Sequence, residues 1–279
     1  NTIIKYPVSS LEINEKSGNI REKKMGYYCA DTDVFRRITS ATGAGNCRHP
    51  LTYILEAADD LAYKTADIED AFVKGFITYS MLERELTVLD GREPRSPFRA
   101  GEKLRQLYER GIKKGVSSPE DYAVKNWIVS VQGFLISCAT FGFTSNYDSI
   151  MDGSFGKDLF YGTFGEALMD LLGDMAYRRV FTSRAIYRME VHESTILNYL
   201  MDRLVHAVLH FDTDDRPESI DARIVSFISE NYKNAYRLHA QGKSEAEKLY
   251  LRLLLVTDYV CGMTDSYAKR LYQEMNGIL

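Results

Sequence analysis

Patterns of paired cysteines are missing from this sequence of 279 residues. Its four cysteines are widely spaced and form neither a CxxC pair nor a zinc-binding pattern. We therefore expect free thiols in a reducing cytoplasm, where disulfides are rare. Proline is scarce, with six residues, and glycine is moderate, with 19. This composition argues against a large β-sandwich and against a disordered tail.

A strong charge of one sign is also missing. The formal net charge is −4, so no global basic field attracts a polyanion. A phosphate-binding site must therefore use a local cluster of Lys and Arg. No unbroken apolar run reaches the ~18 residues of a membrane span, and no basic-then-apolar signal segment opens the chain. We expect a cytoplasmic protein without membrane contact, of ordinary globular composition.

Apolar residues recur with helical spacing along most of the chain. The spacing predicts a helix from Pro50 to about residue 63, since Pro is favourable in a first helical turn. Asp31 is the expected cap of a short helix over 31–42, and Asp67 that of the helix after 63. A polar loop follows at 90–100. Long helices are then expected at 101–114, 119–142, 164–180, 192–210, 220–240 and 243–277. The predicted fold class is all-α, with a small irregular or β segment near the N-terminus.

Two adjacent acids stand out on the helix that follows Pro50. Asp59 and Asp60 come directly after two alanines in an apolar stretch. Residues four apart share a helix face, so Asp59 and Tyr63 project together, while Asp60 points about 100° away, beside Glu56. A buried carboxylate is costly unless it is paired or bound to a metal. Acids at the edge of an apolar stripe can instead face water, and spacing alone leaves both interpretations open.

The surrounding run, RHPLTYILEAADDLAYKTADIEDA, extends from Arg48 to Ala71. It resembles the signature of bacterial dGTPases, which are metal-dependent triphosphohydrolases of the HD-domain superfamily. In that family the last metal-binding Asp lies on this helix, and the tyrosine four residues later lines the nucleotide pocket. The resemblance implies that Asp59 is a metal ligand and Tyr63 a pocket residue. The cofactor it implies is a divalent metal such as Mg²⁺ or Mn²⁺.

Other stretches, from Lys5 to about Tyr272, are similar to the same family. The segment around Tyr6 is similar to the one that follows the catalytic HD region, and the segment KKMGYY resembles a lysine motif that reaches the triphosphate. The resemblance makes Lys5, Lys23 and Lys24 candidate triphosphate ligands, with solvated surface lysines as the alternative. Tyr6 and Tyr63 could pack against the sugar and select deoxyribose.

The family's His-Asp pair is absent, because the sequence contains no His-Asp dipeptide. We therefore expect no catalytic residue in this chain and an N-terminal HD portion before Asn1. The chain would be the C-terminal portion of one dGTPase-like helical domain spanning 1–279, with about 1–90 completing the HD core and about 91–279 forming a C-terminal helical region. His206 and His210 have the i, i+4 spacing of metal ligands, but no third ligand is near them in the sequence.

The resemblance implies a dNTP triphosphohydrolase that converts dGTP to deoxyguanosine and tripolyphosphate, and this chain alone would be inactive. The alternative is a non-catalytic HD-family regulator that senses nucleotides or binds single-stranded DNA. The partners implied are dGTP or another dNTP, the N-terminal HD portion, and further copies in a homo-oligomer such as a hexamer. An Arg-rich and Tyr-rich strip would suit single-stranded DNA or a subunit interface; it comprises Tyr177, Arg178, Arg179, Arg184, Tyr187 and Arg188.

Overall fold

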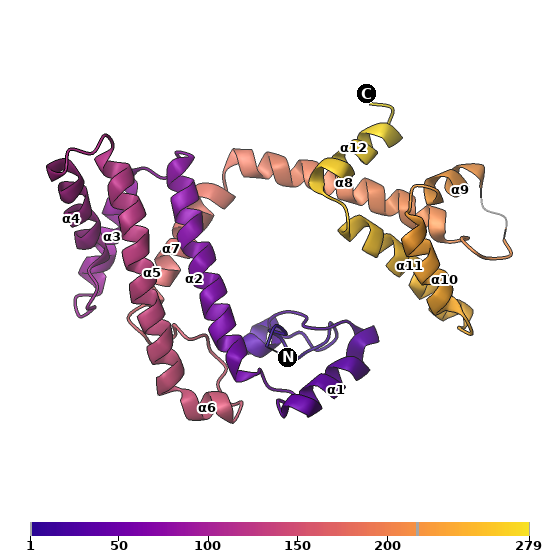
Figure 1. The fold of residues 1–279 in the computed structure, drawn as a ribbon, viewed down its shortest axis with the longest axis horizontal. Coiled ribbons are helices and arrows are strands. Elements are labelled where there is room, and N and C mark those ends of the chain that lie inside the picture. The colour runs from indigo at the N-terminus through magenta and orange to yellow at the C-terminus, as the bar shows by residue number, and fades with distance from the viewer. Residues whose placement is uncertain (1, 216–217, 279) are drawn as a thin grey trace. The chain divides into compact units, whose positions relative to one another are not determined.

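The computed structural model describes residues 2–215 and 218–278. The chain forms two compact units, Asn1–Ser183 and Arg184–Leu279, and each has a hydrophobic core of its own. Within the described ranges every regular element is a helix and no strand occurs (Figure 1). The predicted all-α fold class is confirmed. The expected limit near residue 90, between the end of an HD core and a C-terminal helical region, stays a prediction.

The expected small irregular or β segment near the N-terminus is not borne out. Three short 3-10 helices run through this part of the chain, at Glu15–Ser17, Ile20–Glu22 and Cys29–Asp31. A β-ladder needs a partner strand for its backbone donors and acceptors. Here the backbone bonds are isolated and form no ladder: Asp31 N bonds to Tyr28 O at 2.8 Å within a turn, and Asn14 N bonds to Glu22 O at 2.9 Å.

Unit 1 holds seven α-helices and a π-helical turn within its described residues. They are α1 Thr32–Thr42, α2 Pro50–Val73, α3 Tyr79–Arg92, α4 Ala100–Lys113, α5 Pro119–Ser145, α6 Tyr147–Met151, α7 Glu166–Ala176 and the π-turn Tyr177–Phe181. Unit 2 holds five helices in its described part. They are α8 Arg184–Val208, α9 Ser219–Val225, α10 Glu230–Ala240, α11 Glu245–Cys261 and α12 Asp265–Met275.

Several helix boundaries differ from those that the apolar spacing predicted. α2 continues through Asp67, so the expected helix start there is wrong; no Gly or Pro interrupts the chain between 63 and 67. Asp31 precedes α1 but makes no side-chain cap hydrogen bond. The expected helices at 220–240 and 243–277 are each two helices, because Ser229 and Thr264 cap new ones. α3 was not predicted.

The core of unit 1 lies along α5. This helix packs against α2 and α4, with α7 against α2 (Figure 1). Trp127 of α5 is fully buried and its indole N–H donates to Ala100 O at 2.9 Å. The carboxylate of Asp90 accepts the backbone N–H groups of Gly101 and Glu102, each at 3.0 Å, and so satisfies the start of α4. These contacts join α3, α4 and α5, and α5 in turn packs against α2, which carries the predicted site.

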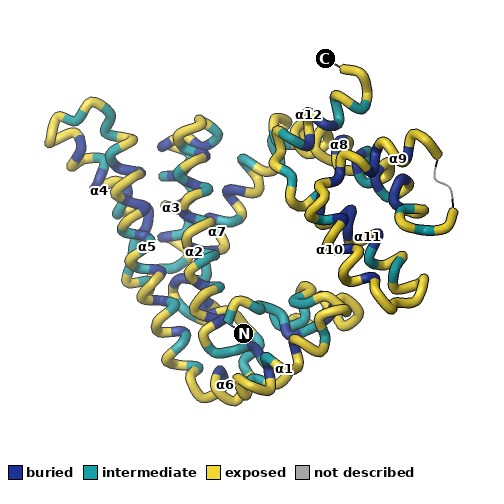
Figure 2. The backbone as a smooth tube through the Cα atoms, turned by 45° about the vertical axis from the view of Figure 1, so that its right-hand side comes forward, coloured by how far each residue is buried: buried dark blue, intermediate teal, exposed yellow. Residues whose placement is uncertain are grey.

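Unit 2 packs α8 against α9, α11 and α12. The buried Tyr259 links separate segments of this unit, with its Oη 2.9 Å from both Phe227 O and Tyr267 Oη. Figure 2 shows buried residues recurring along one side of these helices. This is the pattern of amphipathic helices around a small core.

α5 also has the length and composition of a membrane-spanning helix, with a mean hydropathy of 1.4 over an 18-residue window. Core helices of water-soluble proteins meet the same criteria, so length and composition do not establish a span. Only 28% of that window is buried in the structure. No unbroken apolar run marks this helix in the sequence, because polar residues interrupt it. Part of an apolar helix face is therefore left uncovered by the described residues.

Candidate functional site

An ion pair joins two residues that the sequence assigned to the site separately. Lys5 Nζ lies 2.6 Å from Asp59 Oδ2 on α2. Both side chains keep access to solvent, with 27% and 42% of their surface exposed. The hydrogen bond to Asp59 raises the pKa of Lys5, against a smaller opposing effect of burial. The structure thus brings the predicted triphosphate lysine onto the predicted metal ligand.

Arg48 holds the backbone at this ion pair. Its Nε donates to the Lys5 carbonyl oxygen at 2.6 Å. Its two terminal nitrogens donate to the two carboxylate oxygens of Glu56, at 2.5 and 3.0 Å. The side chain has 0% exposure, and its guanidinium carbon lies 5.5 Å from the ring centre of Tyr6 and 5.3 Å from that of Tyr53. Sequence reasoning missed Arg48 and Glu56 as site residues, because no pattern announces a buried arginine.

The segment that carries Lys23 and Lys24 lies against the backbone at Tyr6. Gly26 N donates to Val8 O at 3.0 Å. A Cβ at Gly26 would lie 1.6 Å from the Tyr6 carbonyl oxygen, so only glycine permits this approach. Both lysines are exposed. Burial raises the pKa of the Tyr6 hydroxyl. The segment around Tyr6 and the segment that carries Lys23 and Lys24 therefore lie side by side in unit 1.

Tyr63 and Asp60 flank Asp59 on α2. Tyr63 lies one helical turn beyond Asp59 but remains 67% exposed, so the described residues do not enclose it in a pocket. Asp60 is partly buried, and burial, followed by the negative charge of Glu56, raises its pKa above the usual range. A carboxyl group of this kind holds a proton at higher pH than an exposed aspartate. Asp60 therefore lies in a partly buried position beside Glu56 and not on the open surface.

The loop after α6 contacts both α2 and the N-terminal segment. Tyr53 Oη donates to Phe155 O at 2.5 Å, and Arg21 Nη1 donates to Gly153 O at 2.8 Å. Ile20 N also bonds to Gly156 O at 3.3 Å. The role of this loop in unit 1 is structural, since it ties the N-terminal segment and α2 together.

No group of three His, Cys, Asp or Glu side chains within 2–215 and 218–278 is arranged to hold a metal ion. Asp59 offers one carboxylate, which Lys5 occupies. His206 and His210 face separate acids, with His206 Nε2 3.7 Å from Asp221 Oδ2 and His210 Nδ1 3.4 Å from Asp215 Oδ2. A metal site needs several converging ligands. The described residues therefore do not make a complete metal centre, and the role of Asp59 stays a prediction.

The arginine strip divides between the two units. Arg178 lies in unit 1, where its Nη2 is 2.7 Å from Asp174 Oδ2 and 3.8 Å from Glu85 Oε2. Arg184 and Arg188 belong to unit 2. One member of the strip is thus engaged by acids, and its binding of single-stranded DNA stays a prediction.

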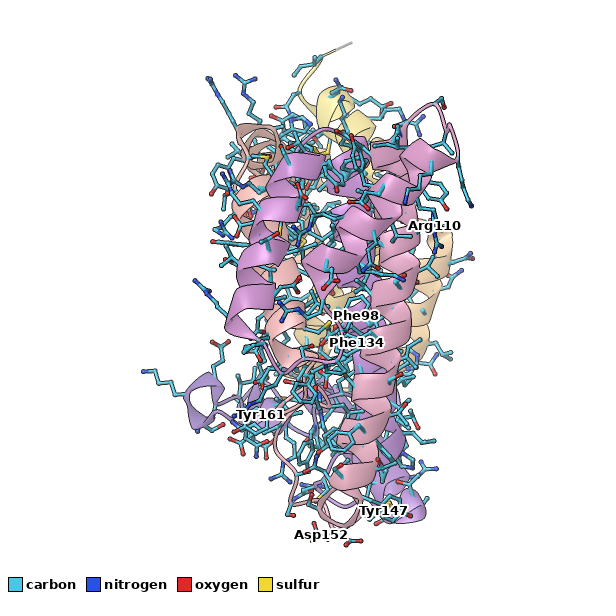
Figure 3. All side chains as sticks on the ribbon, turned by 90° about the vertical axis from the view of Figure 1, so that its left-hand side faces the viewer. Phe98, Arg110, Phe134, Tyr147, Asp152 and Tyr161 are labelled. Carbon is cyan, nitrogen blue, oxygen red and sulfur yellow. The ribbon has the colours of Figure 1, made fainter. Side chains whose placement is uncertain are left out.

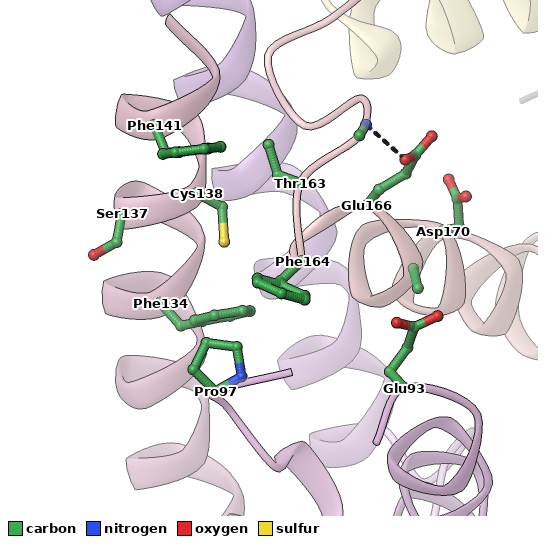
Figure 4. A pocket seen from close by; sticks show the side chains of 12 residues that line it. Glu93, Pro97, Phe134, Ser137, Cys138, Phe141, Thr163, Phe164, Glu166 and Asp170 are labelled. Atoms are coloured by element: carbon green, nitrogen blue, oxygen red, sulfur yellow. Dashed lines mark hydrogen bonds between the residues drawn. The ribbon is translucent and has the colours of Figure 1, made fainter. Parts of the chain in front are cut away.

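A cavity of about 840 Å³ lies between α5 and α7, apart from the predicted site residues (Figure 4). Its α5 wall carries Phe134, which stacks on Phe98 with ring centres 4.7 Å apart (Figure 3). The other side carries carboxylates, one of which, Glu166, accepts the Gly162 N–H at 2.8 Å. The lining residues are Glu93, Pro97, Phe134, Ser137, Cys138, Phe141, Gly162, Thr163, Phe164, Glu166, Ala167 and Asp170. Sequence reasoning did not find this cavity, because its walls come from three separate segments.

Known proteins similar to this chain include phosphohydrolase-associated domains and dGTPase-like proteins. Residues 165–274 match the family described as phosphohydrolase-associated domain. The chain is 40% identical over 283 residues to the deoxyguanosinetriphosphate triphosphohydrolase-like proteins of Listeria monocytogenes and Listeria innocua, over 100% of this chain and 59% of theirs. It is 27% identical over 280 residues to the deoxyguanosinetriphosphate triphosphohydrolase of Yersinia enterocolitica, over 93% of this chain and 55% of that protein.

The resemblance indicated by the motifs is therefore confirmed, and the chain is a relative of the dGTPase-like proteins. It spans just over half the length of the curated relatives that it matches. The activity, substrates and partners of the whole protein are consequently matters of proposal.

Proposed function

We propose that the protein containing this chain hydrolyses deoxynucleoside triphosphates, dGTP first among them, to a deoxynucleoside and tripolyphosphate. The observation that carries the proposal is the Lys5–Asp59 pair on the motif helix of a dGTPase-like relative. In this reaction water attacks the α-phosphorus, the bond to the sugar O5′ breaks, and O5′ takes up a proton.

The residues of this chain have binding roles in the proposal. Lys5, Lys23 and Lys24 neutralise charge that spreads over the triphosphate. Tyr6 and Tyr63 pack against the sugar, where a tyrosine edge excludes a 2′-hydroxyl. Asp59 contributes one oxygen ligand to a Mg²⁺ or Mn²⁺ ion, whose other ligands come from outside this chain. Such an ion polarises a phosphoryl oxygen and acidifies bound water.

Replacing Asp59 tests the assignment directly. In the intact protein, Asp59→Ala should lower dGTP hydrolysis by about 100-fold or more, because loss of mere supporting groups around a metal already costs 10–100-fold. Release of deoxyguanosine measured by chromatography gives the rate. Asp70→Ala is the matched control, since Asp70 lies exposed on the same helix and pairs with Lys74. Wild-type turnover in the Asp59 variant would overturn the assignment.

A second function is favoured by one observation, the lack of a three-ligand cluster in the described residues. We propose as the alternative a non-catalytic regulator that senses nucleotides or binds single-stranded DNA. The coding sequence upstream of Asn1 separates the two: a His-Asp motif there supports the enzyme, and its absence supports the regulator. In either case we propose a cytoplasmic homo-oligomer such as a hexamer.

A further inference from the structure

We propose that Arg48 is a positioning residue that holds Lys5 and Tyr6 in place for the substrate. The proposal rests on the function proposed above and deepens it. Arg48 itself is fully buried, so it does not touch the nucleotide. It acts through the main chain of Lys5 and the ring of Tyr6.

The contacts of Arg48 connect three parts of the site. One nitrogen fixes the Lys5 carbonyl oxygen, and two nitrogens grip the Glu56 carboxylate in a two-pronged pair. Planar pairs of this kind are rigid, because both hydrogen bonds must break before the guanidinium can turn. Lys5 is thus held twice: its backbone by Arg48 and its ammonium group by Asp59. Its amino group is therefore held at Asp59 of α2 before any ligand binds.

Tyr6 is held by the same guanidinium. The positive charge lies 5.5 Å from the centre of its ring, within the range of a cation–π contact. Tyr53 takes the second aromatic contact at 5.3 Å, and its hydroxyl is anchored on Phe155. The guanidinium therefore lies against both rings, with one ring belonging to the substrate segment and the other to the core of α2.

A purely stabilising role predicts a different outcome in mutants, which makes the two roles separable. Removing Arg48 alone leaves the Glu56 carboxylate without its ion-pair partner in a mostly buried position, which is strongly destabilising. Replacing both partners by apolar residues of similar volume is often neutral or stabilising. The double variant Arg48→Met/Glu56→Leu should therefore fold, yet it lacks the bond to Lys5 O.

Kinetics of the intact protein give the first readout. We expect the double variant to keep its melting temperature and to raise the KM for dGTP about tenfold, the size expected for one charge-assisted hydrogen bond, with little change in kcat. The double variant Asp70→Leu/Lys74→Met is the matched control, because it makes the same kind of replacement at an exposed ion pair of the same helix, away from Lys5. An Arg48→Met/Glu56→Leu variant with wild-type KM would show that Arg48 only stabilises the fold.

Acylation of lysines by a water-soluble active ester, read by mass spectrometry, gives a second readout that does not depend on activity. Lys5 should react several-fold faster in the Arg48→Met/Glu56→Leu variant than in the wild type, because its main chain, without the bond to Arg48, no longer holds the amino group against Asp59. Exposed Lys24 is the internal reference, and Asp70→Leu/Lys74→Met should stay close to wild type. Unchanged Lys5 reactivity overturns the positioning role. If the intact protein hydrolyses no dNTP, the proposed function fails, while the Lys5 result still decides the role of Arg48.

Discussion

Lys5 and Asp59 are 54 positions apart in the sequence, and their side chains meet at 2.6 Å. Each was singled out for a separate reason, the lysine for the triphosphate and the aspartate for the metal. Their pairing places a positive group of the N-terminal segment beside a negative group of α2. Arg48 holds the main chain of Lys5 beside this pair, although nothing in its sequence position distinguishes it from a surface arginine.

Gly26 is the residue on which the second lysine segment depends. A Gly26→Ala change places a methyl group where the Tyr6 carbonyl oxygen lies, 1.6 Å from the ideal Cβ position. We expect a loss of about 1–3 kcal/mol of stability, as for other overpacked sites, measured by denaturant unfolding. Gly91→Ala is the control, since a Cβ there meets nothing within 4 Å and alanine favours a helix. Equal stability of Gly26→Ala and wild type would contradict this close packing.

At the scale of elements, α2 organises the candidate site. One uninterrupted helix from Pro50 to Val73 carries Glu56 and, about one turn later, Asp59 and Asp60, and it packs on α5 and α7. Its continuity matters, because a break after Tyr63 would let that residue move independently of Asp59. Lys64 Nζ bonds to Met169 O of α7 at 3.2 Å and fixes the rotation of the helix.

The start of α11 provides a pH-dependent element in unit 2. Ser244 and Glu247 form a capping box, and the hydrogen bonds from Ser244 lower the pKa of Glu247 from 4.5 to about 2. A lowered folded-state pKa contributes stability that is present above pH 4.5 and is lost as pH falls from there toward about 2. In the Glu247→Gln variant, the melting temperature should therefore depend less on pH within this window than it does in the wild type. The same slope in variant and wild type would contradict the capping role.

At the scale of the whole molecule, the uncovered face of α5 calls for a partner. Val129 and Ile136 are both exposed and lie seven residues apart, so they share one side of the helix. Exposed apolar patches of this kind mark interfaces. The chain matches relatives nearly twice its length, and we proposed an oligomer above.

We predict that the chain by itself associates through this face and hydrolyses no dGTP. Light scattering after size-exclusion chromatography should show a mass that rises with concentration. The variant Val129→Lys/Ile136→Lys should shift the protein toward monomer, while Leu238→Lys, at an exposed position of unit 2, should not. A wild-type chain that is monomeric at every concentration, or that turns over dGTP unaided, would contradict the respective part of this prediction.

The sequence by itself determined the helical class, because apolar spacing reports local amphipathic structure. It also predicted the resemblance to the dGTPase-like proteins, from the long run around Asp59 and Tyr63. Helix limits were harder: Asp67 has the chemistry of a cap but lies inside α2, since packing on α5 and α7 outweighs local preference. The starts at Ser229 and Thr264 show the opposite error, as caps hidden within long apolar patterns.

Only the tertiary structure decided which residues meet. The Lys5–Asp59 pair, the burial of Arg48 and the close approach of Gly26 to Tyr6 all depend on contacts between segments far apart in the chain. Local sequence carries no signal for such contacts, because they arise from packing in three dimensions. The motif thus pointed to Asp59, and the fold supplied Arg48, the residue that holds the lysine beside it.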